Sequence, residues 1–320
     1  MMDDDFSYGF IAFRVRGAEP ELLFLKRREG FLDVPKGHPE NSENAMDAAL
    51  REMREETGLE PKEILKGFRM EAYYSMGRDS GKRTKHIMLF LCRVSGEPSL
   101  SDEHSGFEWL SEERMRKSGE SFIGNAKEEL MEAFEYIRRN DAIERLNKEY
   151  SKLPYSTDGW KLSSNFVPGT GNLLAGVMLV GQAPGAEEDK SGVPFVGRSG
   201  KLLDRLISIA GLKREDLYIT SVVQFFPPKN RLPSREETAL CLPYLRRQIE
   251  IVRPRIIVTL GALSSYSLVG VEKIALNHGI PVIQDGVTYF PSLHPAAGVR
   301  FKKNVALLEK DFEELGKLIS

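Results

Sequence analysis

Residues Gly37–Leu59 in the first half of the chain read GHPENSENAMDAALREMREETGL. Near the end of this stretch, Glu52, Glu55 and Glu56 stand at positions i, i+3 and i+4, so a helix places all three carboxylates on one side. Carboxylates this close repel one another unless a cation lies between them, and hard oxygen ligands favour magnesium or manganese. The stretch therefore predicts a divalent-metal site on a helix.

The same stretch resembles the signature of the Nudix hydrolases, G-x5-E-x7-R-E-U-x-E-E-x-G-U with U aliphatic, and matches it at every fixed position. The matching residues are Gly37, Glu43, Arg51, Glu52, Met53, Glu55, Glu56, Gly58 and Leu59. The resemblance implies that the last three glutamates bind the metal at a diphosphate and activate water, with Glu55 catalytic. Gly37, Glu43, Arg51 and Gly58 are implied to hold the loop and the helix together.

Over about residues 7–139, the chain resembles one branch of that family, the asymmetrical diadenosine tetraphosphate hydrolases. Pro35-Lys36-Gly37-His38 leads into the signature, and Ser101–His104 followed by Phe107–Leu110 matches a later motif. The resemblance implies phosphate contacts from Lys36, His38 and Lys85, base stacking by Tyr74, and Glu103 as a metal ligand or general base. Asp33 departs from the relatives, which often have an aromatic residue there, so ADP-ribose and damaged nucleoside triphosphates stay open as substrates.

Periodicity predicts two domains, residues 1–140 and 141–320. In the first, strands at Tyr8–Val15, Leu22–Leu25 and His86–Val94 surround helices at Ala45–Glu56 and Asn125–Arg138, which is typical of an α+β fold. The Nudix resemblance implies a mixed sheet between helices. After a charged, helix-prone stretch at Ala142–Leu153, strands and helices alternate, which predicts an α/β fold with a doubly wound parallel sheet.

Three motifs of the second half follow predicted strands. They are Gly181-Gln182-Ala183-Pro184-Gly185, Tyr218-Ile219-Thr220-Ser221-Val222-Val223 at the end of its predicted strand, and Ser292-Leu293-His294-Pro295-Ala296-Ala297. Glycine after a strand lets the backbone approach a ligand closely, and ligands in open α/β sheets lie beyond the carboxyl ends of the strands. The sequence therefore predicts a second binding site there.

These motifs resemble the uracil-DNA glycosylase superfamily, in particular its iron–sulfur family, over about residues 142–318. The resemblance implies that a nucleotide is flipped out of DNA and that its N-glycosidic bond is cut. It also implies base or DNA contacts from Gly181, Gln182, Ala183, Phe195, Ser221 and His294. Phe195 would stack on the base, Gln182 would take a catalytic position, and His294 would stabilise the charge of the leaving base.

Three departures from that family stand out. Gln182 replaces a glutamate and Ser221 replaces the base-reading asparagine, so discrimination against cytosine should weaken. The four cluster cysteines correspond to Tyr150, Leu153, Phe225 and Cys241. One thiolate cannot hold a [4Fe–4S] cluster, so we expect none, with a packed apolar plug in its place.

Composition narrows the remaining choices. No apolar run is long enough for a membrane span and the acidic start is unlike a signal peptide, so we expect a cytoplasmic protein without membrane contact. The net charge is about −6 before Asp141 and about +4 from it onward, so the second half could lie on a phosphate backbone, although chance gives the same imbalance. The sequence does not fix the oligomeric state.

Two functions follow as hypotheses. The first is a bifunctional enzyme that hydrolyses a nucleoside polyphosphate with Mg²⁺ or Mn²⁺, converting diadenosine tetraphosphate to ATP and AMP, and that excises uracil or another deaminated base from single-stranded or mismatched DNA. The alternative keeps the hydrolase but makes the second half a non-catalytic DNA- or base-binding module. Gln182 and Ser221 favour the alternative, whereas Phe195 and His294 favour excision.

Overall fold

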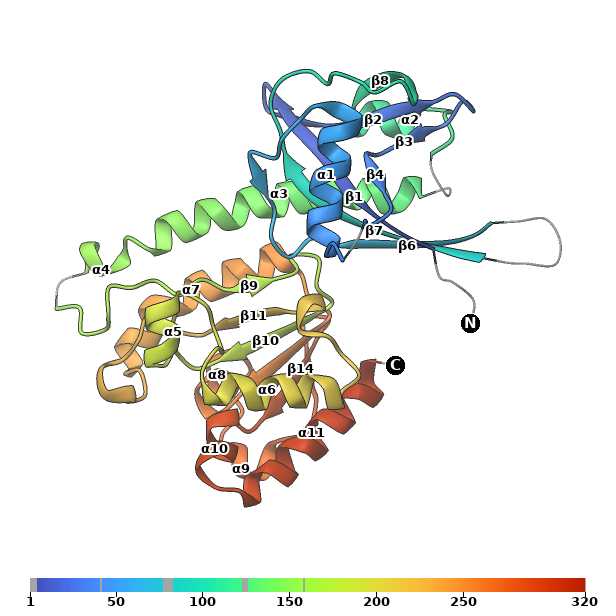
Figure 1. The fold of residues 1–320 in the computed structure, drawn as a ribbon. Coiled ribbons are helices and arrows are strands. Elements are labelled where there is room, and N and C mark those ends of the chain that lie inside the picture. The colour runs from blue at the N-terminus through green and yellow to red at the C-terminus, as the bar shows by residue number, and fades with distance from the viewer. Residues whose placement is uncertain (1–4, 41, 77–82, 123–125, 158, 320) are drawn as a thin grey trace. The chain divides into compact units, whose positions relative to one another are not determined.

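The structure is a computed structural model that describes residues 5–40, 42–76, 83–122, 126–157 and 159–319, without the side chains of residues 74–76, 83–84 and 155–156. The chain divides into two compact units, Met1–Arg138 and Arg139–Ser320 (Figure 1). One helix, α3 (Lys127–Tyr150), crosses this division. The sequence predicts two helical stretches here, but no glycine or proline interrupts them, and the helix is continuous.

Unit 1 contains one mixed sheet. Its elements are β1 (Asp5–Arg16), β2 (Glu19–Arg27), β3 (Leu32–Asp33), β4 (Lys36–Gly37), α1 (Ala45–Thr57), β5 (Glu63–Ile64), β6 (Met70–Met76), β7 (Arg83–Arg93), β8 (His104–Ser111) and α2 (Glu112–Lys117), before α3. The main strand order is β3-β2-β1-β7-β5, with β4, β6 and β8 joined to β1, β7 and β2. The β1–β7 pair is parallel and the other pairs are antiparallel, which confirms the predicted mixed sheet.

Successive side chains along the strands of unit 1 point to opposite faces of the sheet, and both faces carry buried apolar residues. On one face, Phe10 packs in a core with Ala49 and Met53 of α1. On the other face, Phe24 contacts Phe122 edge to face, with ring centroids 5.2 Å apart. The sheet therefore lies between layers, with α1 held against it (Figure 1).

Unit 2 alternates strands and helices. Its elements are α4 (Leu153–Ser156), β9 (Thr170–Gly171), β10 (Val177–Gly181), α5 (Ala186–Ser191), α6 (Arg198–Ile209), the 3-10 turn η2 (Arg214–Asp216), β11 (Tyr218–Ser221), the 3-10 turn η3 (Pro228–Asn230), α7 (Arg235–Val252), β12 (Ile256–Leu260), α8 (Ala262–Val269), α9 (Ile274–Asn277), β13 (Val282–Gln284), β14 (Val287–Ser292), α10 (Pro295–Arg300) and α11 (Lys303–Ile319).

The sheet of unit 2 has the order β13-β14-β12-β10-β11-β9. Strands β14, β12, β10 and β11 are parallel, as predicted, but the edge strands β9 and β13 are antiparallel. The parallel prediction was wrong at the edges because each is a short strand of two or three residues, and β13 turns straight back onto β14. Leu203 of α6 and Phe312 of α11 pack on one face, while Gln248 of α7 reaches Thr220 on the other.

Candidate active sites

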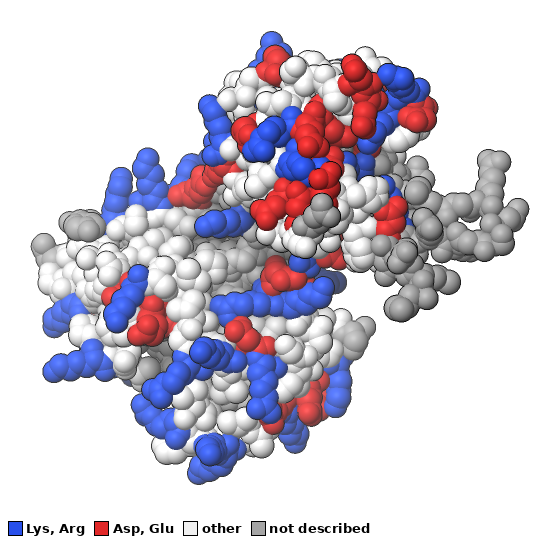
Figure 2. Space-filling view, viewed as in Figure 1, with Lys and Arg blue, Asp and Glu red and all other residues white. Residues whose placement is uncertain are grey.

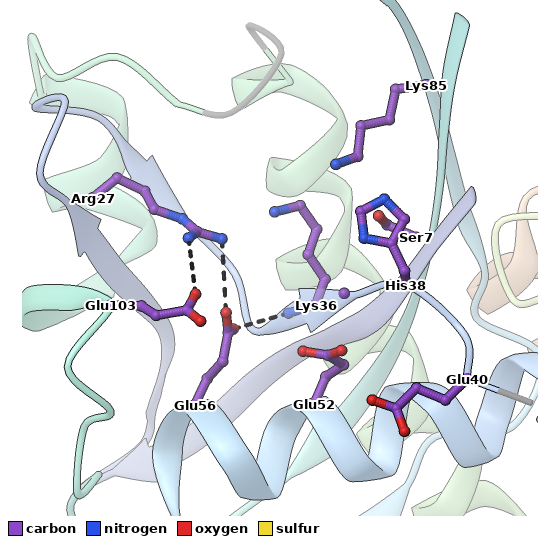
Figure 3. Close-up of a pocket in the computed structure, with 10 residues that line it drawn as sticks. Ser7, Arg27, Lys36, His38, Glu40, Glu52, Glu56, Lys85 and Glu103 are labelled. Carbon is purple, nitrogen blue, oxygen red and sulfur yellow. Dashed lines mark hydrogen bonds and ion pairs between the residues drawn. The ribbon is translucent and has the colours of Figure 1, made fainter. Parts of the chain in front are cut away.

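Helix α1 positions the glutamates of unit 1. It begins at Asn44, whose side chain accepts hydrogen bonds from the N–H groups of Met46 and Asp47, and it ends at Gly58 in the left-handed region (φ 65°). Glu52 and Glu56 lie one turn apart on α1 and point to the same side of it, and Glu56 is buried (Figure 3).

Arg51 joins the loop before α1 to the helix. Its guanidinium donates to Glu43 at 3.0 Å, to the carbonyl of His38 at 2.7 Å and to Glu55 at 3.0 Å. These carboxylates raise the pKa of Arg51 above its ordinary value, Glu43 most. Gly37 belongs to the same joint, because a Cβ there would lie 2.0 Å from the Glu52 carboxylate. A side chain at position 37 would therefore displace the Glu52 carboxylate from its place beside the loop.

A cavity of about 420 Å³ opens above α1 (Figure 3). It is lined by the acidic residues Glu40, Glu52, Glu56 and Glu103 and by Ser7, Arg27, Lys36, Gly37, His38 and Lys85. Arg27 points to Glu56 and Glu103 (Figure 3). Glu55 is not among the lining residues, since its half-exposed side chain turns to Arg51. The structure thus gathers three of the four predicted metal ligands.

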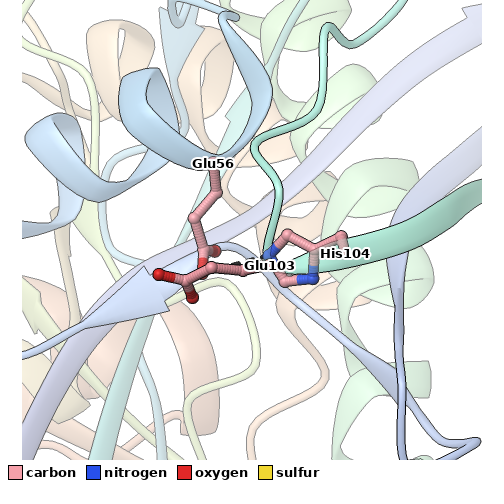
Figure 4. Close-up of side chains that lie close together, drawn as sticks. All are labelled: Glu56, Glu103 and His104. Carbon is pink, nitrogen blue, oxygen red and sulfur yellow. Dashed lines mark ion pairs between the residues drawn. The ribbon is translucent and has the colours of Figure 1, made fainter.

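Glu56 and Glu103 approach a residue that sequence reasoning did not assign, His104 (Figure 4). One ligand atom of each of the three lies within 4.8 Å of the others. The buried His104 Nε2 is 3.2 Å from Glu56 Oε1, and neither ring nitrogen makes a hydrogen bond to the described residues. Burial raises the pKa of Glu52. The carboxylates of Glu56 and Glu103 and the imidazole of His104 fit a divalent cation. His104 could have been predicted as a ligand from its position next to Glu103 in the sequence.

The cationic side of the cavity has its own counterions. The buried Lys36 Nζ lies 2.6 and 2.7 Å from the two oxygens of Asp33, and burial lowers the pKa of Lys36. His38 Nε2 is 2.5 Å from Asp5 Oδ1. Asp33, which stands where the resembled family often has an aromatic residue, thus forms an ion pair with Lys36, one of the residues predicted to contact phosphate. Tyr74 belongs to β6, but its side chain lies outside the described residues.

In unit 2, parallel strands bring the second set of predicted residues together. Gln182 follows β10, Ser221 ends β11, and His294 comes two residues after β14. All three line one cavity of about 700 Å³, together with Ala183 and Phe195. The structure therefore brings these residues together at the carboxyl ends of the parallel strands.

Phe195 is held in an unusual conformation beside this cavity. Its φ is 55°, in the left-handed region that non-glycine residues rarely adopt. Its ring lies against Gly181, where a Cβ would come within 2.6 Å of Phe195 Cζ. It also stacks on His294, with ring centroids 5.9 Å apart and planes 25° apart. Gly181 thus makes room for the ring, and the strain is stored at the cavity.

His294 is a neutral hydrogen-bond donor. Its Nδ1 accepts from the Ala296 N–H at 3.1 Å, so the proton of the neutral ring is on Nε2. Burial lowers the pKa of His294 to about 4, against a weaker opposing effect of Glu188. At neutral pH this side chain can therefore donate one proton in a hydrogen bond without carrying charge.

The other polar groups of the cavity are fixed. Gln182 Oε1 accepts from the Leu263 N–H at 3.4 Å. Glu188 accepts from the backbone N–H groups of Gly185, Val196 and Gly197 at 2.9 to 3.0 Å. Because its oxygens hold the backbone together, Glu188 is not a substitute for the missing carboxylate at position 182.

The positions of the family's cluster cysteines hold an aromatic core. Tyr150, Phe225 and Cys241 are fully buried, and the Tyr150 ring lies 5.2 Å from Phe225 and 4.1 Å from Tyr244. Burial raises the pKa of the Cys241 thiol to about 11, so it stays protonated. These residues do not fit an iron–sulfur cluster, which needs thiolates.

Two family models match the chain. The NUDIX domain matches residues 6–134, and the uracil DNA glycosylase superfamily matches residues 168–316. None of the helices in the described part combines the length and apolar character of a membrane span.

Curated proteins are similar to each half. A type-4 uracil-DNA glycosylase of Saccharolobus solfataricus is 43% identical and covers 50% of this chain and 79% of that protein. One from Thermotoga maritima is 43% identical, covering 44% and 75%. An asymmetrical bis(5'-nucleosyl)-tetraphosphatase of Rattus norvegicus is 36% identical, covering 32% and 76%. The chain therefore belongs to the Nudix family through its first half and to the uracil-DNA glycosylase superfamily through its second.

Proposed function

We propose that unit 1 hydrolyses diadenosine tetraphosphate to ATP and AMP with magnesium or manganese. The observation that carries this proposal is the cavity in which Glu52, Glu56 and Glu103 face Lys36 and Lys85. A divalent cation on the glutamates would supply Lewis-acid activation of water and neutralise phosphate charge. The similarity to the rat tetraphosphatase supports the choice of substrate.

The residues of unit 1 have separable roles in this proposal. Lys36, His38 and Lys85 bind the phosphate chain, and Glu55 or Glu103 accepts the proton of the attacking water. Arg51 and Glu43 keep the loop at the helix, so that Gly37 and Glu52 stay in contact. Asp33 holds Lys36 at the cavity wall.

Chromatography of the products tests this substrate. The purified protein with magnesium should convert diadenosine tetraphosphate to equimolar ATP and AMP. The reason is that binding of one nucleoside fixes which phosphorus atom of the chain lies next to the attacking water. Formation of two ADP, or hydrolysis of ADP-ribose alone, would contradict the proposal.

We propose that unit 2 excises uracil or another deaminated base from DNA, preferentially where the base is unpaired. Phe195 stacks on the flipped base, and the Nε2–H of His294 donates to the base oxygen on which negative charge develops as the glycosidic bond breaks. The observation that carries this proposal is the hydrogen bond from the Ala296 N–H to His294 Nδ1 beside Phe195, which leaves Nε2 of the neutral ring as the donor. The similarity to type-4 uracil-DNA glycosylases supports it, and places the chain in DNA repair.

The alternative is a module that binds DNA or a base without cutting. Gln182 in place of a carboxylate favours this function, because an amide cannot take a proton from water. Incubation of the full chain with oligonucleotides that contain uracil, hypoxanthine or xanthine, followed by strand cleavage at abasic sites, separates the two. Binding without any abasic product would establish the module.

A further inference from the structure

Strand β14 leads to His294, and its last residues extend beyond the neighbouring strand β13. Among the described residues, β13 pairs with β14 at residues 287–289, whereas β12 continues along the other side to Ser292. Beyond β13, the N–H of Gly279 donates to the carbonyl of Pro291 at 2.8 Å. The end of β14 is therefore held on this side by contacts from outside the sheet.

Asp311 of α11 makes two further contacts at this edge. Its Oδ2 accepts from the Ser292 hydroxyl at 2.7 Å, and its Oδ1 lies 2.8 Å from His278 Nδ1. Asp311 is 3% exposed and Ser292 is fully buried. A Cβ at Gly279, where φ is 74°, would lie 2.8 Å from Asp311 Oδ1, so glycine lets the chain come close to the carboxylate. The buried carboxylate thus joins α11 and the loop after α9 to the last residue of β14.

Ser292 is two residues before His294, and the backbone between them is closely packed. The Ser292 carbonyl accepts from the Gly261 N–H at 2.8 Å, and the next residue, Leu293, belongs to the buried core. A Cβ on Gly261 would lie 3.0 Å from the His294 Cβ. A shift of Ser292 should therefore also shift the imidazole.

A donor that stabilises a developing anion must be held within about 0.5 Å of its working position. We propose that Asp311 is a positioning residue for base excision, which acts through Ser292 to hold the His294 Nε2–H at the leaving base. This inference rests on the proposed base excision. Asp311 is not among the residues that line the cavity, so it acts on the reaction only through others.

A merely structural role is the alternative, because breaking the hydrogen bonds of a buried carboxylate destabilises a fold. The two roles differ in their dependence on His294. Positioning affects excision only while His294 is present, whereas destabilisation acts in either case. DNA binding is an internal reference, since the exposed Arg198 and Arg300 line the cavity, and Lys and Arg side chains are spread over the face of unit 2 in view (Figure 2).

The first test is single-turnover excision by the full chain from single-stranded DNA that contains uracil. Ser292→Ala and Asp311→Leu should each lower the rate by about tenfold with nearly unchanged DNA binding, and the double variant should lose no more than either. In the His294→Ala protein, adding Ser292→Ala should change the residual rate less than about twofold. Asp311→Asn should keep the rate within about threefold of the wild type, because its amide can accept from Ser292 and donate to a neutral His278 ring.

Thr238→Val is the matched control. Thr238 is 9% exposed and its hydroxyl donates to the Ser234 carbonyl at 2.8 Å, but it does not line the cavity. This variant loses one hydroxyl of unit 2, as Ser292→Ala does, and should leave excision unchanged. A similar loss in Thr238→Val, an undiminished effect of Ser292→Ala in the His294→Ala protein, a parallel loss of DNA binding, or failure of Asp311→Asn to keep the rate would overturn the positioning role.

The second test requires no cutting, so it separates a failure of this inference from a failure of the proposed excision. Burial lowers the pKa of His294 to about 4. NMR of the ring nitrogens, assigned by comparison with His294→Ala, should show this pKa raised by about one unit or more in Ser292→Ala and unchanged in Thr238→Val. If the wild type releases no base, the proposed excision fails, and a raised pKa in Ser292→Ala would still support the link from Asp311 to His294. An unchanged pKa in Ser292→Ala would contradict that link.

Discussion

The two cavities of this chain handle charge in opposite ways. In unit 1, the acidic Glu52, Glu56 and Glu103 face cationic residues across a cavity, and Arg27 lies 3.6 Å from Glu103 and 3.7 Å from Glu56. In unit 2, His294 is neutral and Glu188 is saturated by backbone N–H groups. The first site collects charges that a cation and a polyphosphate can balance, whereas the second presents fixed dipoles to a charge that arises only during reaction.

The largest effect should follow the loss of a buried acid in unit 1. Glu56→Gln should slow nucleotide hydrolysis by on the order of a hundredfold or more, because it removes a charged ligand position while keeping the shape of the side chain. Steady-state turnover at saturating magnesium checks this. Glu60→Gln, which alters an exposed partner of Arg54, should leave turnover unchanged.

Glu55→Gln sharpens the same comparison. If Glu55 is a catalytic residue, Glu55→Gln should also lower the turnover of nucleotide hydrolysis by about a hundredfold without unfolding the protein. Its exposed side chain bonds to Arg51 in the structure, and a mere counterion there should cost less than about threefold. Turnover of Glu55→Gln beside Glu56→Gln distinguishes these two roles.

In unit 2, His294→Ala should lower base excision by about a hundredfold, as expected when one donor to a developing anion is lost. DNA binding should change little, because the charge appears only as the bond breaks. Single-turnover excision and fluorescence anisotropy measure the two quantities. A parallel loss of binding would show that His294 acts on the ground state.

The lowered pKa of His294 predicts a stability effect. Above pH 6.5 the side chain is neutral in both the folded and unfolded protein, but between pH 6.5 and about 4 only the unfolded chain binds the proton. The free energy of unfolding should therefore decrease as the pH is lowered from 6.5 to about 4, by at most about 3 kcal/mol. Urea unfolding of the wild type and His294→Asn measures it, and the variant should lack this part of the slope.

The smallest effect should come from Ser221→Asn. An amide can donate and accept at a base edge together, so the variant should favour uracil over cytosine by about tenfold more than the wild type does. Excision from matched oligonucleotides with each base gives the ratio. An unchanged ratio would show that position 221 does not read the base.

The contrast between the sites also explains what the sequence could predict. Glu52 and Glu56 follow helical spacing, so their common side could be predicted from local periodicity alone, whereas the turn of Glu55 to Arg51 could not. The strand ends of unit 2 could be predicted because parallel strands align their carboxyl ends.

Other features depend on contacts between residues distant in sequence. His104 meets Glu56 across the fold, 48 residues away along the chain. The left-handed conformation of Phe195 follows from packing against Gly181 and His294, and no local signal predicts it. The antiparallel direction of the edge strands was missed, because strands of two or three residues carry no periodicity that indicates their pairing.

The central claim is that one chain holds a metal-dependent nucleotide hydrolase and a metal-independent glycosylase. Both activities should be measured on the same purified protein before and after treatment with EDTA, and again after magnesium is restored. We predict that EDTA abolishes hydrolysis of diadenosine tetraphosphate, that magnesium restores it, and that release of uracil from single-stranded DNA is unaffected throughout. Loss of both activities with EDTA, or hydrolysis that persists without metal, would contradict the claim.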